Sequence, residues 1–191
     1  MTSAPGAFDP GAFDTVQFRA ALGRFASGVT VVSTLHDGFD HAMTASAFTS
    51  VSLDPPRVLV CVMRTTRFHE AVMASRRWGV SILARDGQDA ASWLATKGRP
   101  LEHQLDAFPH HRGSVTGAAL IDAALAWLEC ETQAVYDGAD HSIVVGQVLS
   151  AASRDEADDP LLYYRSHYGS LIRSSASEKT PHVLPPGRET G

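Results

Sequence analysis

The chain has 191 residues, 44% hydrophobic and 19% charged, a composition typical of a globular protein with one domain and a real core. The formal net charge is −5, and no basic cluster exists beyond Arg76-Arg77, which disfavours nucleic acid and anionic lipid as partners. Residues 1–11 lack a signal-peptide pattern and no long apolar run follows, so we expect a cytoplasmic protein without a membrane span.

Two terminal segments lack the apolar pattern of a packed element. Residues 1–13 are rich in Ala, Gly, Pro and Phe, and residues 173–191 mix Ser, Pro, Lys and Glu. Neither offers enough apolar surface to offset the entropy of ordering. We therefore predict a disordered N-terminal tail, one domain over residues 14–172, and a flexible C-terminal tail.

The first predicted element is a helix. Asp14 is its N-cap candidate, Gln17 completes a capping-box pattern, and the apolar spacing runs on until Gly28. Residues 29–34, rich in Val and Thr, then predict a strand. The Asp37-Gly38 pair predicts a hairpin turn from this strand into the segment that follows.

That following segment, residues 41–56, carries five Ser/Thr hydroxyls among small side chains between Ala42 and Ser52. It closes on Asp54-Pro55-Pro56 and leads into the apolar residues 58–63. Low bulk lets a backbone approach a planar or phosphorylated ligand, and the hydroxyls can meet its oxygens. The alternative is a solvated edge strand, because such strands are also rich in Ser and Thr.

Residues 57–63 form a nearly all-apolar run, which predicts a strand buried on both faces or closed into a barrel. Arg64-Thr-Thr-Arg67 follows directly and opens a predicted helix over residues 66–74, with Thr66 as N-cap candidate. Hydroxyls, helix N-terminal N–H groups and two guanidinium candidates would make a phosphate site. A capped helix with solvated arginines is the alternative.

Strands dominate the second half of the chain. We predict strands over residues 78–84, 126–136 and 142–150, the last two joined by the Asp137-Gly-Ala-Asp140 turn. Asp86 is expected to cap a helix that ends near Gly98. Many strands, short turns and few helices predict a β-rich barrel with peripheral helices rather than a doubly wound sheet.

Several kinds of site are disfavoured. No Gly-rich nucleotide motif and no Gly-x-Ser-x-Gly elbow is present. Cys61 and Cys130 lie in apolar runs, so we expect buried free thiols rather than a nucleophile. His103, His110 and His111 have no neighbouring Cys or carboxylate pair to complete a tetrahedral set, so no metal site is predicted.

Two further features have a functional and a structural interpretation. His141 leaves a polar turn and enters a strand, where a surface role is the more frequent one. The Tyr163-Tyr-Arg-Ser-His-Tyr-Gly169 cluster suits stacking on a flat heterocycle, although such clusters also anchor a chain end to the core.

Five segments, in this order, resemble the flavin reductase-like family. They are Thr44–Pro56, Val60–Val62, Trp78–Leu83, Asp140–Val148 and Pro160–Gly169. The resemblance covers about residues 16–171. It implies an FMN-binding split β-barrel of Greek-key type with a few peripheral helices, usually a homodimer with the flavin near the interface.

The resemblance also implies a set of site residues. The flavin ring and ribityl chain would lie against Thr44, Ala45, Ser46, Ala47, Ser50, Val51 and Ser52, with Pro55 and Cys61 from the same motifs. Ala47 stands where many relatives have Ser, which removes one side-chain hydrogen bond. The phosphate would be held by Thr65, Thr66 and Arg67, and the nicotinamide bordered by His141, as the catalytic candidate, with Tyr168 and Gly169. Lys97 and Arg99, where the resemblance is weaker, are hypothetical phosphate or adenine contacts.

The implied activity is an NAD(P)H:flavin oxidoreductase that passes reduced flavin to a partner monooxygenase. Hydride transfer from nicotinamide to flavin N5 is the cofactors' own chemistry, and the protein supplies alignment. FAD or FMN, and NADH or NADPH, all stay open. One alternative is a pyridoxamine phosphate oxidase-like enzyme, which wants clustered basic residues that are dispersed in this sequence. Another is a non-catalytic flavin-binding module.

Overall fold

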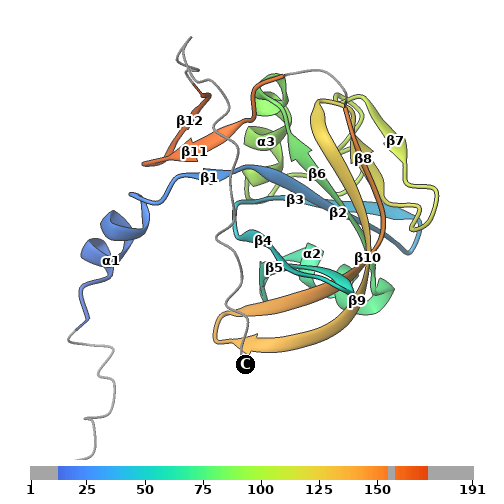
Figure 1. Cartoon of the computed structure of the whole chain (residues 1–191), viewed down its shortest axis with the longest axis horizontal. Helices are drawn as coiled ribbons and strands as arrows, with labels where there is room; N and C mark the ends of the chain where they lie inside the picture. Colours follow the sequence, from blue (N-terminus) through green and yellow to red (C-terminus); the bar gives the residue numbers. More distant parts are fainter. Residues whose placement is uncertain (1–12, 155–157, 172–191) are drawn as a thin grey trace, which may run out of the picture.

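A seven-stranded antiparallel sheet forms the framework of the protein in the computed structural model, which describes residues 13–154 and 158–171 (Figure 1). Its strands are β2 (Thr30–His36), β3 (Phe39–Ala45), β4 (Phe48–Leu53), β5 (Pro56–Met63), β6 (Arg77–Leu83), β9 (Ala124–Gly138) and β10 (His141–Ser153). Their order across the sheet is β3-β2-β6-β9-β10-β5-β4.

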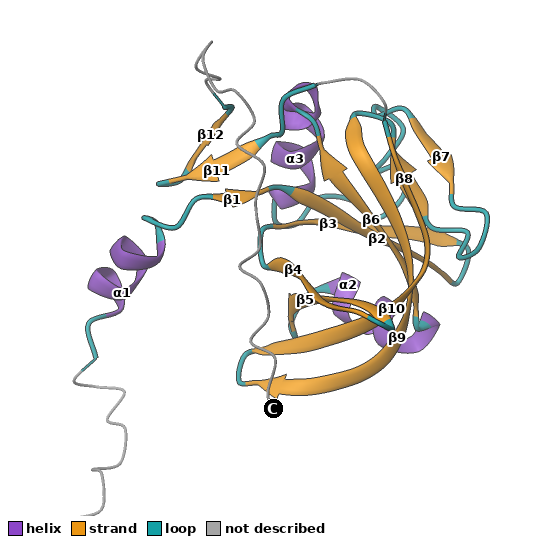
Figure 2. Cartoon of the chain, in the orientation of Figure 1, coloured by secondary structure: helices purple, strands orange, loops and turns teal. Residues whose placement is uncertain are grey.

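The sheet is curled into a barrel, because its two edge strands follow one another in the chain. β3 and β4 lie at opposite edges, yet only Ser46 and Ala47 separate them. A link of that length spans roughly 10 Å, since consecutive Cα atoms are about 3.8 Å apart. The Cys61 N–H also donates to the Ala47 carbonyl at 3.0 Å, which ties the link to β5. The predicted β-rich split barrel is confirmed (Figure 2).

Smaller elements surround the barrel. They are α1 (Thr15–Leu22), α2 (Arg67–Ser75), a 3-10 turn (Arg85–Gly87), α3 (Gln88–Ala95), a β7–β8 pair (His110–Arg112, Ala119–Ile121) and a three-stranded sheet of β1 (Ser27–Gly28), β11 (Leu162–Tyr164) and β12 (His167–Gly169). No described helix is long and apolar enough to cross a membrane.

Hydrophobic residues pack on both faces of the curled sheet. Neighbouring residues of β2 divide between them, because side chains alternate along a strand: Val32 joins the cluster around Trp78, and Val31 joins the cluster around Leu94 of α3. Gly146 of β10 makes room for the indole, since a Cβ there would lie 2.5 Å from a Trp78 ring carbon. The cluster around Leu94 fixes α3 against the sheet, and the chain after α3 forms one wall of a cavity.

The structure corrects several predicted boundaries. The Asp14 carboxylate caps α1 by accepting from the Val16 and Gln17 N–H groups, but the helix ends at Leu22, because Gly28 already belongs to β1. Gly87, not Asp86, is the N-cap of α3, because a 3-10 turn precedes the helix.

β5 fulfils the second of its two predicted alternatives, because it belongs to the closed barrel. It is buried on one face only, with Val58, Val60 and Val62 inward and Cys61 half-exposed. β9 and β10 extend beyond the predicted ranges. Their pairing survives two register shifts, so bulges rather than strand ends occur there. Of the tails predicted over residues 1–13 and 173–191, only Phe13 lies among the described residues.

Candidate functional site

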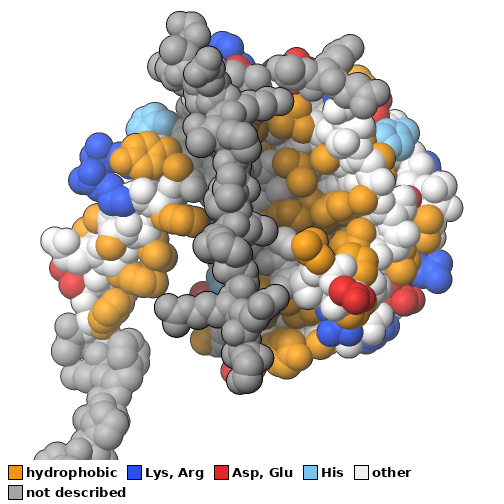
Figure 3. Space-filling model, viewed as in Figure 1, with side chains coloured by type: hydrophobic (Ala, Val, Ile, Leu, Met, Phe, Trp, Pro, Cys, Tyr) orange, Lys and Arg blue, Asp and Glu red, His pale blue; other side chains and the backbone are white. Residues whose placement is uncertain are grey.

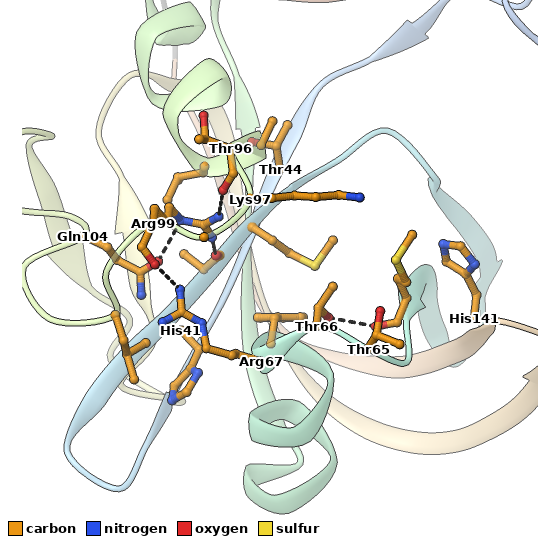
Figure 4. Close-up of a pocket in the computed structure, with 18 of the residues that line it drawn as sticks. His41, Thr44, Thr65, Thr66, Arg67, Thr96, Lys97, Arg99, Gln104 and His141 are labelled. Atoms are coloured by element: carbon orange, nitrogen blue, oxygen red, sulfur yellow. Dashed lines mark hydrogen bonds between the residues drawn. The ribbon is translucent and has the colours of Figure 1, made fainter.

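A cavity of about 550 Å³ opens between the barrel edge and the two helices that flank it (Figure 4). Residues 41–44 of β3 and Cys61 and Met63 of β5 form its sheet walls. Residues 65–68 at the start of α2 close it from one side, and residues 94–99 and 101, at the end of α3 and in the loop after it, close it from another. The cavity therefore sits where the barrel is split, between elements far apart in sequence.

Arg99 is fixed at one end of this cavity by uncharged acceptors. Its Nε donates to Gln104 Oε1 at 3.2 Å, its Nη1 to the Thr96 carbonyl at 2.8 Å, and its Nη2 to the Ala42 carbonyl. Burial, and next the charge of Arg67, lower the pKa of Arg99 from its usual value. The group nevertheless stays charged at neutral pH, because an arginine titrates far above it.

Arg67, the first residue of α2, reaches across to the same place. Its Nη2 donates to the Arg99 carbonyl at 2.6 Å, which links the start of α2 to the loop after α3. Together with Lys97, these arginines give the cavity wall three cationic side chains, and none of the described residues that line it is Asp or Glu. This end of the cavity is therefore suited to an anionic group such as a phosphate.

His41 lies beside this cationic group. Burial, and then the nearby charges of His36 and Arg67, lower the pKa of His41 below 6.5, so its ring is neutral at neutral pH. Its Nδ1 is buried and has no hydrogen-bond partner among the described residues.

The helix N-terminus at the cavity is capped as predicted. The Thr66 hydroxyl accepts from the His69 N–H at 3.2 Å and donates to the Met63 carbonyl at 2.8 Å. Its side chain is thus committed to the cap, so Thr65 is the better hydroxyl candidate for a ligand. Nearby, Arg64 is not a cavity residue; it pairs with Asp137 at 2.5 Å and donates to the His141 carbonyl.

His141 lines the other end of the cavity, opposite the arginines (Figure 4). Its Nδ1 is 2.8 Å from Asp140 Oδ1, and this contact lowers the pKa of the Asp140 carboxyl. The carboxylate orients the imidazole, while Arg64 holds the turn that carries both residues. His141 is therefore a positioned side chain rather than a loose surface residue.

The family described as "Flavin reductase like domain" matches residues 22–171. The chain belongs to this flavin reductase-like family.

Relatives within the family cover most of the chain. The "NADH-dependent FAD reductase" of Streptomyces globisporus is 41% identical over 139 residues, which are 72% of this chain and 76% of the relative. The "NADH-dependent flavin reductase" of a Rhodococcus species is 37% identical over 174 residues, covering 90% and 94%. The crystal structure of BorF, the flavin reductase component of a bacterial two-component tryptophan halogenase, superposes with a TM-score of 0.78 at 42% identity, covering 84% of this chain and 100% of BorF.

Six of the residues that the flavin reductase-like resemblance implied meet at the cavity. They are Thr44, Cys61, Thr65, Thr66, Arg67 and His141. The Thr44 hydroxyl donates to the Ala91 carbonyl of α3 at 2.6 Å, so it braces the wall as well as lining it. Cys61 was expected to be a buried thiol; it is half-exposed because its strand turns only alternate residues inward. Cys130 is buried as expected.

The other implied residues line no part of this cavity in the single chain. Ala45 is buried, and Ser46 and Ala47 form the β3–β4 link. Residues 50–52 lie on the outer strand β4, where the Ser52 hydroxyl donates to the Pro55 carbonyl at 2.5 Å. Tyr168 and Gly169 lie on β12, where the Tyr168 ring packs 5.3 Å from the Tyr163 ring and against the α3 side of the core.

Sequence reasoning missed several cavity residues of this flavin reductase-like chain. Met43, Met63 and Gln104 come from three separate segments, and no motif joined them. Lys97 and Arg99 were named only as hypothetical contacts; both line the cavity. His41 is the first residue of the hydroxyl-rich segment, and alternation along β3 places it on the same side as Met43.

The prediction that the basic residues do not cluster requires a correction. They are dispersed in the sequence, and this dispersion was the argument against a pyridoxamine phosphate oxidase-like enzyme. The fold nevertheless gathers Arg67, Lys97 and Arg99, so the assignment to the flavin reductases depends on the family match. In the described part of the chain, no three His, Cys, Asp or Glu side chains gather as a metal site would require.

Proposed function

We propose that this protein is an NADH:flavin oxidoreductase that uses FAD or FMN as its flavin substrate. The composition of the cavity wall is the main support for this proposal. It has a cationic end where no described carboxylate lines the wall, an apolar wall from Met43, Cys61 and Met63, and His141 at the far end. A flavin nucleotide has the matching features, a flat apolar ring and a phosphorylated tail.

The comparisons support the choice of reaction and of reductant. Relatives are named as NADH-dependent reductases of FAD and of flavin, and one relative of Agrobacterium fabrum, 36% identical, as an FMN reductase that uses NADH. A structure of the S. globisporus NADH:FAD oxidoreductase holds NAD and FAD fragments; it superposes with a TM-score of 0.80 at 34% identity, covering 90% of this chain.

The chain's own residues act by binding and alignment. Bound flavin would accept a hydride, two electrons and one proton, from the nicotinamide ring and leave NAD⁺. Arg67 and Lys97 offset the phosphate charge, and Thr65 offers a hydroxyl beside them. His141, oriented by Asp140, sets the position of the second ring at the cavity mouth.

Absorbance at the NADH band tests the reaction. NADH is expected to be consumed only when FAD or FMN is added, with NADPH giving the slower rate. Flavin binding without turnover would favour the non-catalytic flavin-binding module. Absence of both binding and turnover would contradict the proposed function.

Two variants test the division of the cavity between the two substrates. His141→Ala is expected to raise the KM for NADH by about tenfold with flavin affinity nearly unchanged. Thr65→Ala is expected to weaken flavin and leave the KM for NADH near wild type. Loss of flavin in His141→Ala, with normal NADH kinetics, would reverse the division.

A partner monooxygenase is the proposed recipient of the reduced flavin. Relatives include the reductase component of a Rhodococcus opacus 4-nitrophenol monooxygenase, 36% identical over 159 residues. Stopped-flow measurement of flavin release is the direct test. Reduced flavin that dissociates faster than turnover supports transfer, and flavin retained through many turnovers contradicts it.

We also propose a homodimer. None of the residues of α1 is buried in the single chain, although Val16, Phe18 and Leu22 are large and apolar. Figure 3 shows apolar side chains along this helix and over the face of the barrel. On that barrel, Leu53 of the outer strand β4 is 89% exposed. A second copy would cover such apolar surface.

Light scattering tests the oligomeric state. The wild-type chain is expected at twice the monomer mass, and Phe18→Ser with Leu22→Ser is expected to shift it toward the monomer. Because α1 buries nothing within its own chain, the double variant should keep the fold. A wild-type monomer with full activity would contradict the homodimer.

A further inference from the structure

We propose that Arg99 is a positioning residue, which holds the loop after α3 so that Lys97 faces the anionic part of the bound substrate. This inference depends on the proposed function, because it names which cation of the cavity meets a phosphate. Arg99 lines the same cavity but acts through its neighbour, not through its own charge.

The first observation is that the three nitrogens of the Arg99 guanidinium are all used within the protein. The acceptors are Ala42 of β3, Thr96 at the end of α3, and Gln104 further along the loop. A planar guanidinium can reach three acceptors in fixed directions, which an ammonium cannot reproduce. Arg99 therefore joins a strand, a helix end and a loop at one point.

The second observation is that the anchor extends beyond Arg99. The Gln104 side-chain amide donates to the Asp40 carbonyl, and the Trp93 indole donates to the Gln104 carbonyl at 2.9 Å. The Arg99 carbonyl in turn accepts from Arg67. Removing the Arg99 guanidinium would thus free the loop from β3 at the place where it borders the cavity.

The third observation concerns the turn between the two cations. Gly98 has a φ of +74°, in the left-handed region that glycine adopts readily. Through this turn, Arg99 points back to Gln104, while Lys97 extends into the cavity (Figure 4). No ion pair or hydrogen bond of the Lys97 side chain is found among the described residues. Of the two cations in this loop, Lys97 is thus the one whose side chain remains available to a substrate phosphate.

Flavin binding by single and double variants tests this arrangement. FAD or FMN is titrated into the full-length protein, and fluorescence gives the Kd. Lys97→Ala and Arg99→Gln are each expected to raise the Kd for flavin about tenfold, as loss of one charge-assisted contact would. If Arg99 acts through Lys97, the double variant should also lose only about tenfold, because the two effects are not independent.

Arg99→Lys separates positioning from charge. It keeps the cation but loses the three-way anchor, so we expect the same tenfold loss as for Arg99→Gln. Wild-type affinity in Arg99→Lys, or a loss of about a hundredfold in the double variant, would overturn the proposal and make Arg99 a direct ligand. If wild-type protein binds no flavin at all, the proposed function fails instead.

Two further variants guard against a general loss of structure. Arg154→Gln removes another arginine that donates to a backbone carbonyl, that of Asp122, away from the cavity, and should leave the flavin Kd unchanged. If Arg99→Gln does not fold, Gln104→Ala removes one Arg99 acceptor and keeps every cavity charge. It should weaken flavin in the wild-type background and not in Lys97→Ala; unchanged affinity in both backgrounds would contradict the proposal.

Discussion

The cationic end of the cavity, formed by Arg67, Lys97 and Arg99 and here called the rim, differs from the side of the sheet covered by β7 and β8 in how its charged side chains are paired. On the β7–β8 side, Arg112 makes two contacts of 2.5 and 2.7 Å with the Asp40 carboxylate, and His111 lies 2.7 Å from Asp122. At the rim, Arg67 and Arg99 donate to carbonyl and amide oxygens, and no ion pair of theirs is found among the described residues. Acceptors without charge fix both guanidinium groups without placing beside the cavity a carboxylate that would repel a bound anion. The paired side is arranged for stability, and the rim is arranged to bind an anion.

The strongest way to break this contrast is to bring a carboxylate to the rim. Arg67→Glu should weaken flavin on the order of a hundredfold, because it removes one cation and adds one repulsive charge. The fold should tolerate it, since Glu is favourable in the first turn of a helix such as α2. Flavin titration and thermal unfolding of the same sample measure both quantities.

Arg112→Glu is the matched control for that charge reversal. It reverses a charge of the same kind next to Asp40, outside the cavity. We expect a lower melting temperature and little change in flavin affinity. Equal flavin losses in the two variants would show that overall charge, and not the rim, governs binding.

Glu129 is a further charged side chain on the β7–β8 side that is held by hydrogen bonds within the protein. It is only 4% exposed and accepts from the Val115 N–H at 2.9 Å and from the Thr116 N–H and hydroxyl at 2.6 and 2.8 Å. Burial alone would raise the pKa of Glu129, but these hydrogen bonds outweigh it and lower the pKa. Glu129→Gln should therefore cost about 2 kcal/mol of unfolding free energy.

Chemical denaturation at neutral pH measures that loss. Because the folded pKa of Glu129 is depressed, its contribution is present at neutral pH and is lost as the pH falls through the folded pKa. The difference between wild type and Glu129→Gln should accordingly shrink in acid, while the flavin Kd stays the same at neutral pH. A difference that does not change with pH would contradict this role of the carboxylate.

The smallest expected effect concerns His41. Its folded pKa is lowered, so the unfolded chain binds more protons below pH 6.5, and stability should fall as the pH decreases from there. The charges that face the ring are those of His36, Arg67, Asp37 and Asp40. His41→Gln should reduce the fall in melting temperature between pH 7 and 5 by on the order of 1–2 °C. If the melting temperature of His41→Gln falls with pH as much as that of the wild type, groups other than His41 cause the fall.

The sequence predicted those parts of the fold that depend on residues close together in the chain. The Thr66 cap, the Asp37-Gly38 turn and the Asp14 cap are set by neighbours in sequence. The length of α1 did not follow, because the pairing of Gly28 with Leu162 involves the far end of the chain. No local signal reports such a contact.

The candidate site was predictable only where a motif lay on a single element. Thr65 and Arg67 stand together at a helix start, so their joint role could be expected. The meeting of Arg67 with Arg99 could not, because 32 residues separate them and their contact uses a backbone carbonyl. Residues 50–52, which share the hydroxyl-rich segment with Thr44, lie on the opposite sheet edge, because the chain changes edge at Ser46.

The two-residue link between β3 and β4 has a consequence for the width of the cavity. One wall belongs to β3 and another to β5, and the hydrogen bond from the Cys61 N–H to the Ala47 carbonyl joins them. The link thus acts as a spacer whose length sets how far apart the walls stand. Inserting a single glycine between Ser46 and Ala47 would enlarge the cavity without altering any side chain that lines it. The length of this link is therefore expected to limit how bulky a ligand the cavity can hold.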